Sequence, residues 1–323
     1  MSENPDGAPP VMTRPILCLA ITPAVQRTQF FKALRPGEVN RARRTLITAS
    51  GKGVNVALAV QHLGGTARLV GFCGGDSGRF VAAAMKDGGL DARWVETAAP
   101  TRHCHTLIDE QSGQVTELVE EATPPGPAHW QAFQQELERA LPGCAWLAIS
   151  GALPPGAPAG ALSAIAYLAT SLSVSICVDS QGEPLLRTLA ARPALIKLNT
   201  EELATTCGLA NTNLASLSQG ARQLQEQGAG AVLVTDGPHA AYLFHAGQTW
   251  LLQPPPVPVI NPIGSGDSVT AGLLVALQSG QPLAQAAAFG LACGSANAET
   301  ETPAQFTAAR ARELIDAVRI TPA

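Results

Sequence analysis

Short apolar runs recur along this chain, and each is apolar on both faces instead of on alternate residues. Stretches with the apolar spacing of helices follow them, for example at residues 53–65 and 76–89. A strand that is buried on both faces is typical of a parallel sheet covered by helices. The sequence therefore predicts an α/β fold with a mostly parallel central sheet and helices on both of its sides. The runs lie at residues 16–21, 67–73, 145–151, 174–180, 194–199 and 231–237.

Two segments break this pattern. Residues 28–48 and 101–120 alternate polar and apolar side chains around the turns RPGE and EQSG, which is typical of half-exposed strands. Such strands do not fit inside a buried parallel sheet, so we expect a small separate β lid over one end of the core. The prediction is a single domain over residues 15–320 that carries this lid, with residues 1–14 as a mobile tail.

The composition argues against several classes of function. A net charge of −4 gives no basic surface for nucleic acid or for an anionic membrane. No apolar run approaches the length of a membrane span, and the first 15 residues lack the regions of a signal peptide. The seven cysteines, without a C-x-x-C pair, indicate reduced thiols. We expect a cytoplasmic protein with no nucleic-acid or membrane partner.

Two polar motifs lie where helices are expected to begin. GKGVN (51–55) places Lys52 between glycines, where free amides and the helix dipole attract an anion. An ordinary glycine turn with a solvated lysine explains the same residues. NTEE (199–202) places Asn199 and Glu202 on one helix face, which suits a water-rich Mg²⁺ site near phosphates. A helix N-cap is the alternative for this second motif.

A third motif, GSGD (264–267), precedes another helical stretch. Its first three amides could form a concave nest for phosphoryl oxygens, and Asp267 could accept a proton from an attacking hydroxyl. Capping by Ser265 or Asp267 is the alternative. The known phosphate loops are excluded, because Lys52 is followed by glycine instead of Ser or Thr, and because position 269 is valine instead of glycine.

Taken in order, these segments resemble the PfkB (ribokinase-like) family of carbohydrate kinases, and most closely its branch of 1-phosphofructokinases and tagatose-6-phosphate kinases. The resemblance implies a three-layer α/β/α sandwich with a β lid that often forms a dimer surface, and hence a homodimer. It implies an enzyme that uses ATP and Mg²⁺ to phosphorylate a hydroxyl of a hexose phosphate, of the fructose 1-phosphate or tagatose 6-phosphate type. The matching stretches are TPAVQRT, RPGEVNRA, ASGKGVNVA, TR at 101–102, ISGALPPG, VDSQGE, IKLNTEEL, NPIGSGDSVTAG and CGSANA.

The resemblance also implies roles for individual residues. Asp267 matches the catalytic base, and the residues before it, Gly264, Ser265 and Gly266, match the anion hole. Positions implied for the sugar phosphate are Gln26, Gly51, Lys52, Asn55, Ser150, Arg102 and Arg41. Positions implied for ATP and its phosphates are Asn199, Glu202 (indirectly also for Mg²⁺), Asp236, Gly237 and Asn297.

The sequence departs from the family at the sugar-binding end. The family pattern N-P-A-x-D reads TPAVQ here, so Thr22 and Gln26 replace an amide and a carboxylate. Gln26 can form hydrogen bonds but carries no charge. Two other hypotheses therefore stay open: a kinase for an unphosphorylated sugar or a nucleoside, and a catalytically silent sugar-phosphate-binding protein.

Overall fold

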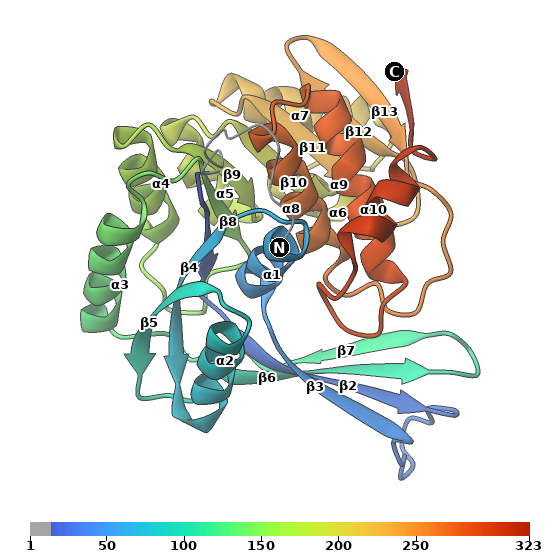
Figure 1. The fold of residues 1–323 in the computed structure, drawn as a ribbon. Coiled ribbons are helices and arrows are strands. Elements are labelled where there is room, and N and C mark those ends of the chain that lie inside the picture. Colours follow the sequence, from blue (N-terminus) through green and yellow to red (C-terminus); the bar gives the residue numbers. More distant parts are fainter. Residues whose placement is uncertain (1–13) are drawn as a thin grey trace, which may run out of the picture.

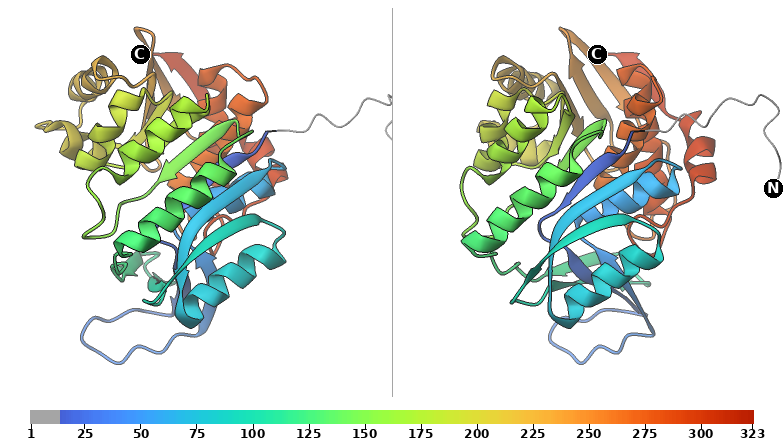
Figure 2. Two further views of the ribbon diagram at one scale, coloured as in Figure 1. Left: turned by 90° about the vertical axis from the view of Figure 1, so that its left-hand side faces the viewer. Right: turned by 60° about the vertical axis from the view of Figure 1, so that its left-hand side comes forward.

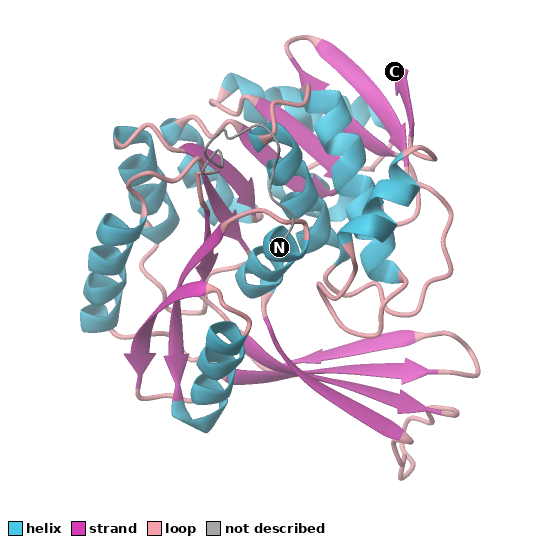
Figure 3. Cartoon of the chain, in the orientation of Figure 1, coloured by secondary structure: helices cyan, strands magenta, loops and turns pink. Residues whose placement is uncertain are grey.

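The structure, a computed structural model, describes residues 14–323. Over these residues a ten-stranded sheet is covered by helices, and a separate four-stranded sheet projects from one end (Figures 1 and 3). The predicted α/β sandwich with a mostly parallel sheet and a β lid is confirmed. The predicted mobile tail, residues 1–14, lies outside the described residues except for Arg14.

Within residues 14–323, the large sheet has the strand order β14-β13-β12-β11-β10-β9-β8-β1-β4-β5. The strands from β11 to β5 are parallel, and β12, β13 and β14 extend one edge in antiparallel fashion. The bounds are β1 (Ile16–Ala20), β4 (Ala67–Gly74), β5 (Asp91–Thr97), β8 (Trp146–Ser150), β9 (Ser175–Asp179), β10 (Leu195–Asn199), β11 (Ala231–Thr235), β12 (Ala241–His245), β13 (Gln248–Gln253) and β14 (Arg319–Pro322).

The order of the parallel strands reverses beside β1. The chain adds β4 and β5 on one side of β1, and then β8, β9, β10 and β11 on the other. In open α/β sheets, ligands bind beyond the carboxyl ends of the strands at such a reversal. The fold therefore places a binding crevice where β1 and β8 end.

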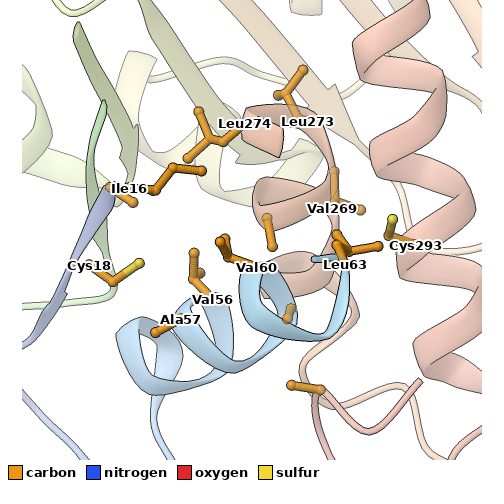
Figure 4. Close-up of a cluster of buried hydrophobic side chains, with 14 of the residues drawn as sticks. Ile16, Cys18, Val56, Ala57, Val60, Leu63, Val269, Leu273, Leu274 and Cys293 are labelled. Atoms are coloured by element: carbon orange, nitrogen blue, oxygen red, sulfur yellow. The ribbon is translucent and has the colours of Figure 1, made fainter. Parts of the chain in front are cut away.

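Helices cover both faces of the sheet (Figure 2). Figure 4 shows the core of the first face, where Val56 and Val60 of α1 lie near Val269 and Leu273 of α8. The helices of this face are α1 (Lys52–His62), α2 (Gly75–Asp87), α8 (Ser265–Gln278), α9 (Leu283–Ala298) and α10 (Ala308–Ile315). The helices of the other face are α3 (Pro127–Ala140), α4 (Ala161–Ser171), α5 (Gly182–Thr188), α6 (Thr200–Cys207) and α7 (Leu214–Glu226).

The lid consists of the two predicted segments and has the strand order β3-β2-β6-β7. Its bounds are β2 (Ala24–Phe31), β3 (Arg44–Ser50), β6 (Arg102–Asp109) and β7 (Val115–Val119). The first lid strand begins at Ala24, before the predicted lid segment 28–48, so Gln26 lies within the lid. An ion pair joins the lid to the core: the Arg44 guanidinium, stacked over Phe30, donates to both carboxylate oxygens of Glu301 at 2.7 and 2.5 Å.

All seven cysteines are unpaired thiols, as predicted. Nothing in residues 14–323 forms a helix with the length and apolar character that a membrane crossing needs.

The start of α1 packs directly on the end of β1. A Cβ atom on Gly53 would lie 1.8 Å from the carbonyl oxygen of Leu19, so only glycine fits there. Gly51, the N-cap of α1, has φ 108°, and a Cβ atom on it would lie 2.9 Å from the carbonyl oxygen of Thr22. These two glycines therefore fix Lys52, which lies between them, against the crevice.

We expect Gly53→Ala to lower the free energy of unfolding by about 3 kcal/mol or more, because the methyl group collides with main-chain atoms that cannot rotate away. The matched control is Gly160→Ala at the start of α4, where the atom nearest to an added Cβ atom is a serine hydroxyl at 3.7 Å. This control should change stability by less than about 0.5 kcal/mol. Denaturant unfolding of both variants measures the difference, and equal stabilities would contradict this close contact.

Candidate active site

The GSGD motif forms the N-terminal turn of α8. Gly264 is the N-cap, with φ 82°, and a Cβ atom on it would lie 2.7 Å from Pro303. The interpretation of Ser265 or Asp267 as the N-cap is therefore wrong. Asp267 is the third residue of α8 and only 5% exposed. The amides of Ser265 and Gly266 precede it at the positive end of the helix dipole, where an anion is stabilised.

Asn297, near the end of α9, holds this turn in place. It is fully buried, and its Nδ2 donates to the carbonyl oxygen of Ile263 at 2.9 Å and to Ser265 Oγ at 3.1 Å. Its Oδ1 accepts from the amide of Ala304 at 2.7 Å. The sequence predicted Asn297 at ATP, which stays a prediction, and these bonds show that its side chain supports the loop that carries Asp267.

Asp267 is oriented by Asn55 of α1. Asn55 Nδ2 donates to Asp267 Oδ2 at 2.7 Å, and Asn55 Oδ1 accepts from Ser50 Oγ at 2.9 Å. Burial raises the pKa of Asp267 to about 6, although the charge of Lys52 acts against this rise. The sequence predicted Asn55 at the sugar, which stays a prediction, and the structure shows its amide bound to the candidate base.

A second buried carboxylate, Asp179, was missed at the level of sequence. It lies at the end of β9, and its oxygens face Lys197 Nζ at 2.9 Å and Lys52 Nζ at 3.4 Å. Burial opposes ionisation of Asp179, but the two lysine charges outweigh burial and hold its pKa below the ordinary value. The available signal was a charged residue inside the apolar runs SICVD and LIKLN, because buried charges require partners.

Lys197 lies against the N-terminal turn of α8. A Cβ atom on Gly266 would be 2.8 Å from Lys197 Nζ, so glycine at this position leaves room for the ammonium group. Attraction by Asp179 raises the pKa of Lys52, so this lysine is available as a cation close to the start of α8.

The NTEE motif caps α6. Asn199 Oδ1 accepts from the amide of Glu202 at 2.7 Å, and Glu202 Oε2 accepts from the amide of Asn199 at 2.8 Å, so the capping interpretation is confirmed. The other oxygen of Glu202 lies 3.6 Å from Lys52 Nζ, which joins this motif to the network. Nearby, Thr200 Oγ1 donates to Asp236 at 3.2 Å, so the turn of Asp236 and Gly237 lies beside the start of α6.

The predicted sugar-site residues are brought together only in part. Ser150, at the end of β8, is buried, and its hydroxyl has no partner. The Arg102 guanidinium donates to the carbonyl oxygens of Glu120 and Thr22, at the base of the lid. Gln26 is buried in the lid and donates to Thr106 Oγ1 at 2.7 Å. Arg41 is exposed in the connection between β2 and β3, away from this network.

The arrangement combines a buried carboxylate of raised pKa, the helix-terminal amide of Gly266 and two lysine side chains, whereas the amide of Ser265 already donates to the carbonyl oxygen of Pro262 at 3.1 Å. Such a set can accept a proton from a hydroxyl and stabilise the negative charge of a transferring phosphoryl group.

Comparison with known proteins agrees with this chemistry. Residues 16–308 match the profile of the pfkB family carbohydrate kinases. The chain belongs to the PfkB family. This PfkB kinase is 33% identical over 277 residues to 1-phosphofructokinase of Rhodobacter capsulatus, a match that covers 85% of this chain and 88% of that protein. Its identity to the 1-phosphofructokinase of Vibrio cholerae serotype O1 is 30%, with 81% and 82% coverage.

A solved structure of a phosphofructokinase has the same fold as this chain. Phosphofructokinase-2 of Escherichia coli in complex with fructose-6-phosphate superimposes with a TM-score of 0.85 at 26% identity, covering 94% of this PfkB chain and 98% of that one. The resemblance proposed from the sequence motifs is thus confirmed.

The raised pKa of Asp267 predicts that its charge destabilises the folded kinase. Between the ordinary value of 3.8 and about 6, the folded state binds the proton that the unfolded state has lost, so stability falls as pH rises through this window. We expect Asp267→Asn to raise the free energy of unfolding at about pH 8 by about 1–3 kcal/mol, with no gain below about pH 4. Denaturant unfolding at both pH values measures this, and a gain that is equal at both would contradict the cause.

Proposed function

We propose that this protein is an ATP-dependent kinase that transfers the γ-phosphoryl group to a hydroxyl of a hexose phosphate, of the fructose 1-phosphate or tagatose 6-phosphate type. The observation that carries the proposal is the position of Asp267. Its carboxylate is buried one residue behind the amides of the α8 turn, with Lys197 packed against Gly266. A base and a phosphoryl-binding site are thereby adjacent.

Asp267 acts as the general base of the transfer. With a pKa of about 6 it is ionised near neutral pH yet more basic than an exposed aspartate, which favours proton transfer from an alcohol. Asn55 holds one oxygen at 2.7 Å, so the other oxygen is directed to the acceptor hydroxyl. The amide of Gly266, with Lys197, stabilises the charge that spreads over the phosphoryl oxygens.

Mg²⁺ fits the charges of this site. In the part of the chain that the structure describes, no cluster of three His, Cys, Asp or Glu side chains forms a metal cage. Two lysines face the three carboxylates Asp179, Glu202 and Asp267, so ATP phosphates would add to an excess of negative charge. Mg²⁺ commonly binds through waters, one or two carboxylates and substrate phosphates. Glu202 and Asn199 would hold it through water, and it would neutralise charge on the phosphates.

The acceptor is a phosphorylated sugar. Arg102, at the base of the lid, has a buried Nε atom without a partner and lies near the crevice, where it suits a phosphate oxygen. Two relatives at 30% identity or more are named 1-phosphofructokinases. Gln26 replaces the usual carboxylate and donates to Thr106, so we assign the sugar hydroxyls to neutral partners, including the unpartnered Ser150 hydroxyl.

We expect Asp267→Asn to lower kcat by at least about 10²-fold, because the acceptor hydroxyl loses its base. ATP binding, measured by calorimetry, should change little. The matched control is Asp76→Asn, an exposed aspartate in the first turn of α2, which should keep the activity of the unaltered protein. Turnover that survives in Asp267→Asn would refute this role.

The same assay decides the acceptor when it is run with fructose 1-phosphate, fructose 6-phosphate, tagatose 6-phosphate, free hexoses and nucleosides. One hexose phosphate should exceed every unphosphorylated acceptor in kcat/KM by at least about 10²-fold. The reason is that the cationic side chains of a site built for a phosphate stay unpaired when the acceptor carries no phosphate. Comparable rates on free sugars would contradict the phosphosugar assignment. Sugar binding without ATP consumption would favour a silent binding protein.

We also propose a homodimer through the outer face of the lid. Ile47, Arg27, His105 and Leu118 form one row across the lid strands, on the face opposite to Gln26. Ile47 and Leu118 are 46% and 53% exposed, although both are large and apolar. Large apolar side chains that are left exposed on both outer strands of one sheet face, with Arg27 and His105 between them, suit an interface.

Replacing both Ile47 and Leu118 by Asp should convert the dimer to a monomer, because four carboxylates would then lie in the apolar interface. Light scattering after size-exclusion chromatography measures the mass. The control is Val39→Asp in the loop between β2 and β3, where Val39 is 80% exposed. A monomeric unaltered protein, or a double variant that stays dimeric, would rule out this interface.

A further inference from the structure

Asp179 is the point at which the elements of the site are tied together. It ends β9, and both of its oxygens are engaged in a fully buried position. Oδ1 faces Lys52 of α1 at 3.4 Å, and Oδ2 accepts from Lys197 of β10 at 2.9 Å and from Thr270 Oγ1 of α8 at 3.3 Å. One carboxylate thus connects α1, β10 and α8.

The two ammonium groups depend on this carboxylate. Both lie within 3.4 Å of Asp179, so they also lie close to each other. Without the negative charge between them, they would repel each other in a region of low dielectric. Lysine has four rotatable side-chain bonds, so released ammonium groups would leave their present positions.

The position of each ammonium group matters for a phosphoryl group. Lys197 lies against the backbone of Gly266, within the phosphoryl-binding turn. Lys52 reaches toward Glu202, 3.6 Å away, on the side of the N-x-x-E motif. Asp179 holds the first cation at the turn of α8 and the second between that turn and the motif of α6.

We propose that Asp179 is a positioning residue, which holds the ammonium groups of Lys52 and Lys197 at the path of the transferred phosphoryl group without contacting a substrate itself. This inference rests on the proposed kinase function. It gives Asp179 an indirect role in transition-state stabilisation, exerted through the two lysines.

A separate electrostatic effect accompanies this role. Burial is the main cause of the raised pKa of Asp267, and the negative charge of Asp179 adds to it. Removing the charge of Asp179 therefore lowers the pKa of Asp267 and moves the acidic limb of the kcat/KM profile to lower pH. A residue that only supports the fold would not move this limb.

The test is Asp179→Asn, compared with Lys197→Met and with the double variant. We expect Asp179→Asn to lower kcat by about 10²-fold, as the loss of one fixed group that stabilises a transition state does. The acidic limb should shift downward. The double variant should lose less than the product of the two single losses, because both changes remove the same Asp179–Lys197 contact, and what it loses beyond Lys197→Met reflects Lys52. The control for a lost charge is Glu183→Gln on α5, which is exposed and should keep full activity.

Two results would overturn the positioning role. One is a near-normal kcat in a folded Asp179→Asn variant. The other is losses of kcat that multiply in the double variant while the acidic limb of the kcat/KM profile stays in place. Where Asp179→Asn does not fold, Asp179→Glu decides the question: it keeps the charge and displaces the ammonium groups, so kcat should fall while the acidic limb stays in place. An unaltered protein that phosphorylates no sugar would overturn the proposed function itself, which is a distinguishable result.

Discussion

The structure depends on the neutralisation of one buried carboxylate. An unpaired Asp179 at the end of β9 would cost several kcal/mol. Its partners, Lys52 and Lys197, come from α1 and β10, so the charge requirement fixes how these elements meet α8. At the edge of the parallel sheet where a ligand would bind, ion pairs thus hold these elements together in addition to the apolar packing beneath them.

The two buried aspartates of this edge illustrate how environment sets chemistry. Asp179 has two cations at close range, and its pKa lies below the ordinary value. Asp267 has an amide donor at 2.7 Å and more distant lysines, and burial raises its pKa to about 6. Carboxyl groups whose environments move their pKa values apart commonly have different roles in one reaction. Here one group is a permanent anion and the other can exchange a proton.

The sequence was informative where a local pattern has one physical cause. Strands apolar on both faces indicated the parallel sheet, and the GSGD turn indicated a helix start that is suited to binding an anion. The Asp179–Lys197 pair and the loop-supporting role of Asn297 could not be predicted, because they depend on contacts between residues distant in sequence. The antiparallel strands β12–β14 were also missed; β13 is only partly buried and β14 is exposed, so these two lack the doubly apolar pattern.

The connections between lid and core are very short. Three residues separate β1 from β2, and β3 ends at Ser50, directly before Gly51 and α1. The lid is thus joined to the core directly beside the crevice, and Lys52 is the second residue after the lid strand β3. A tilt of the lid over a sugar would rotate the backbone at Gly51, and this rotation would move the ammonium group of Lys52. Such a movement would link the occupancy of the sugar site to the position of this cation through the backbone itself.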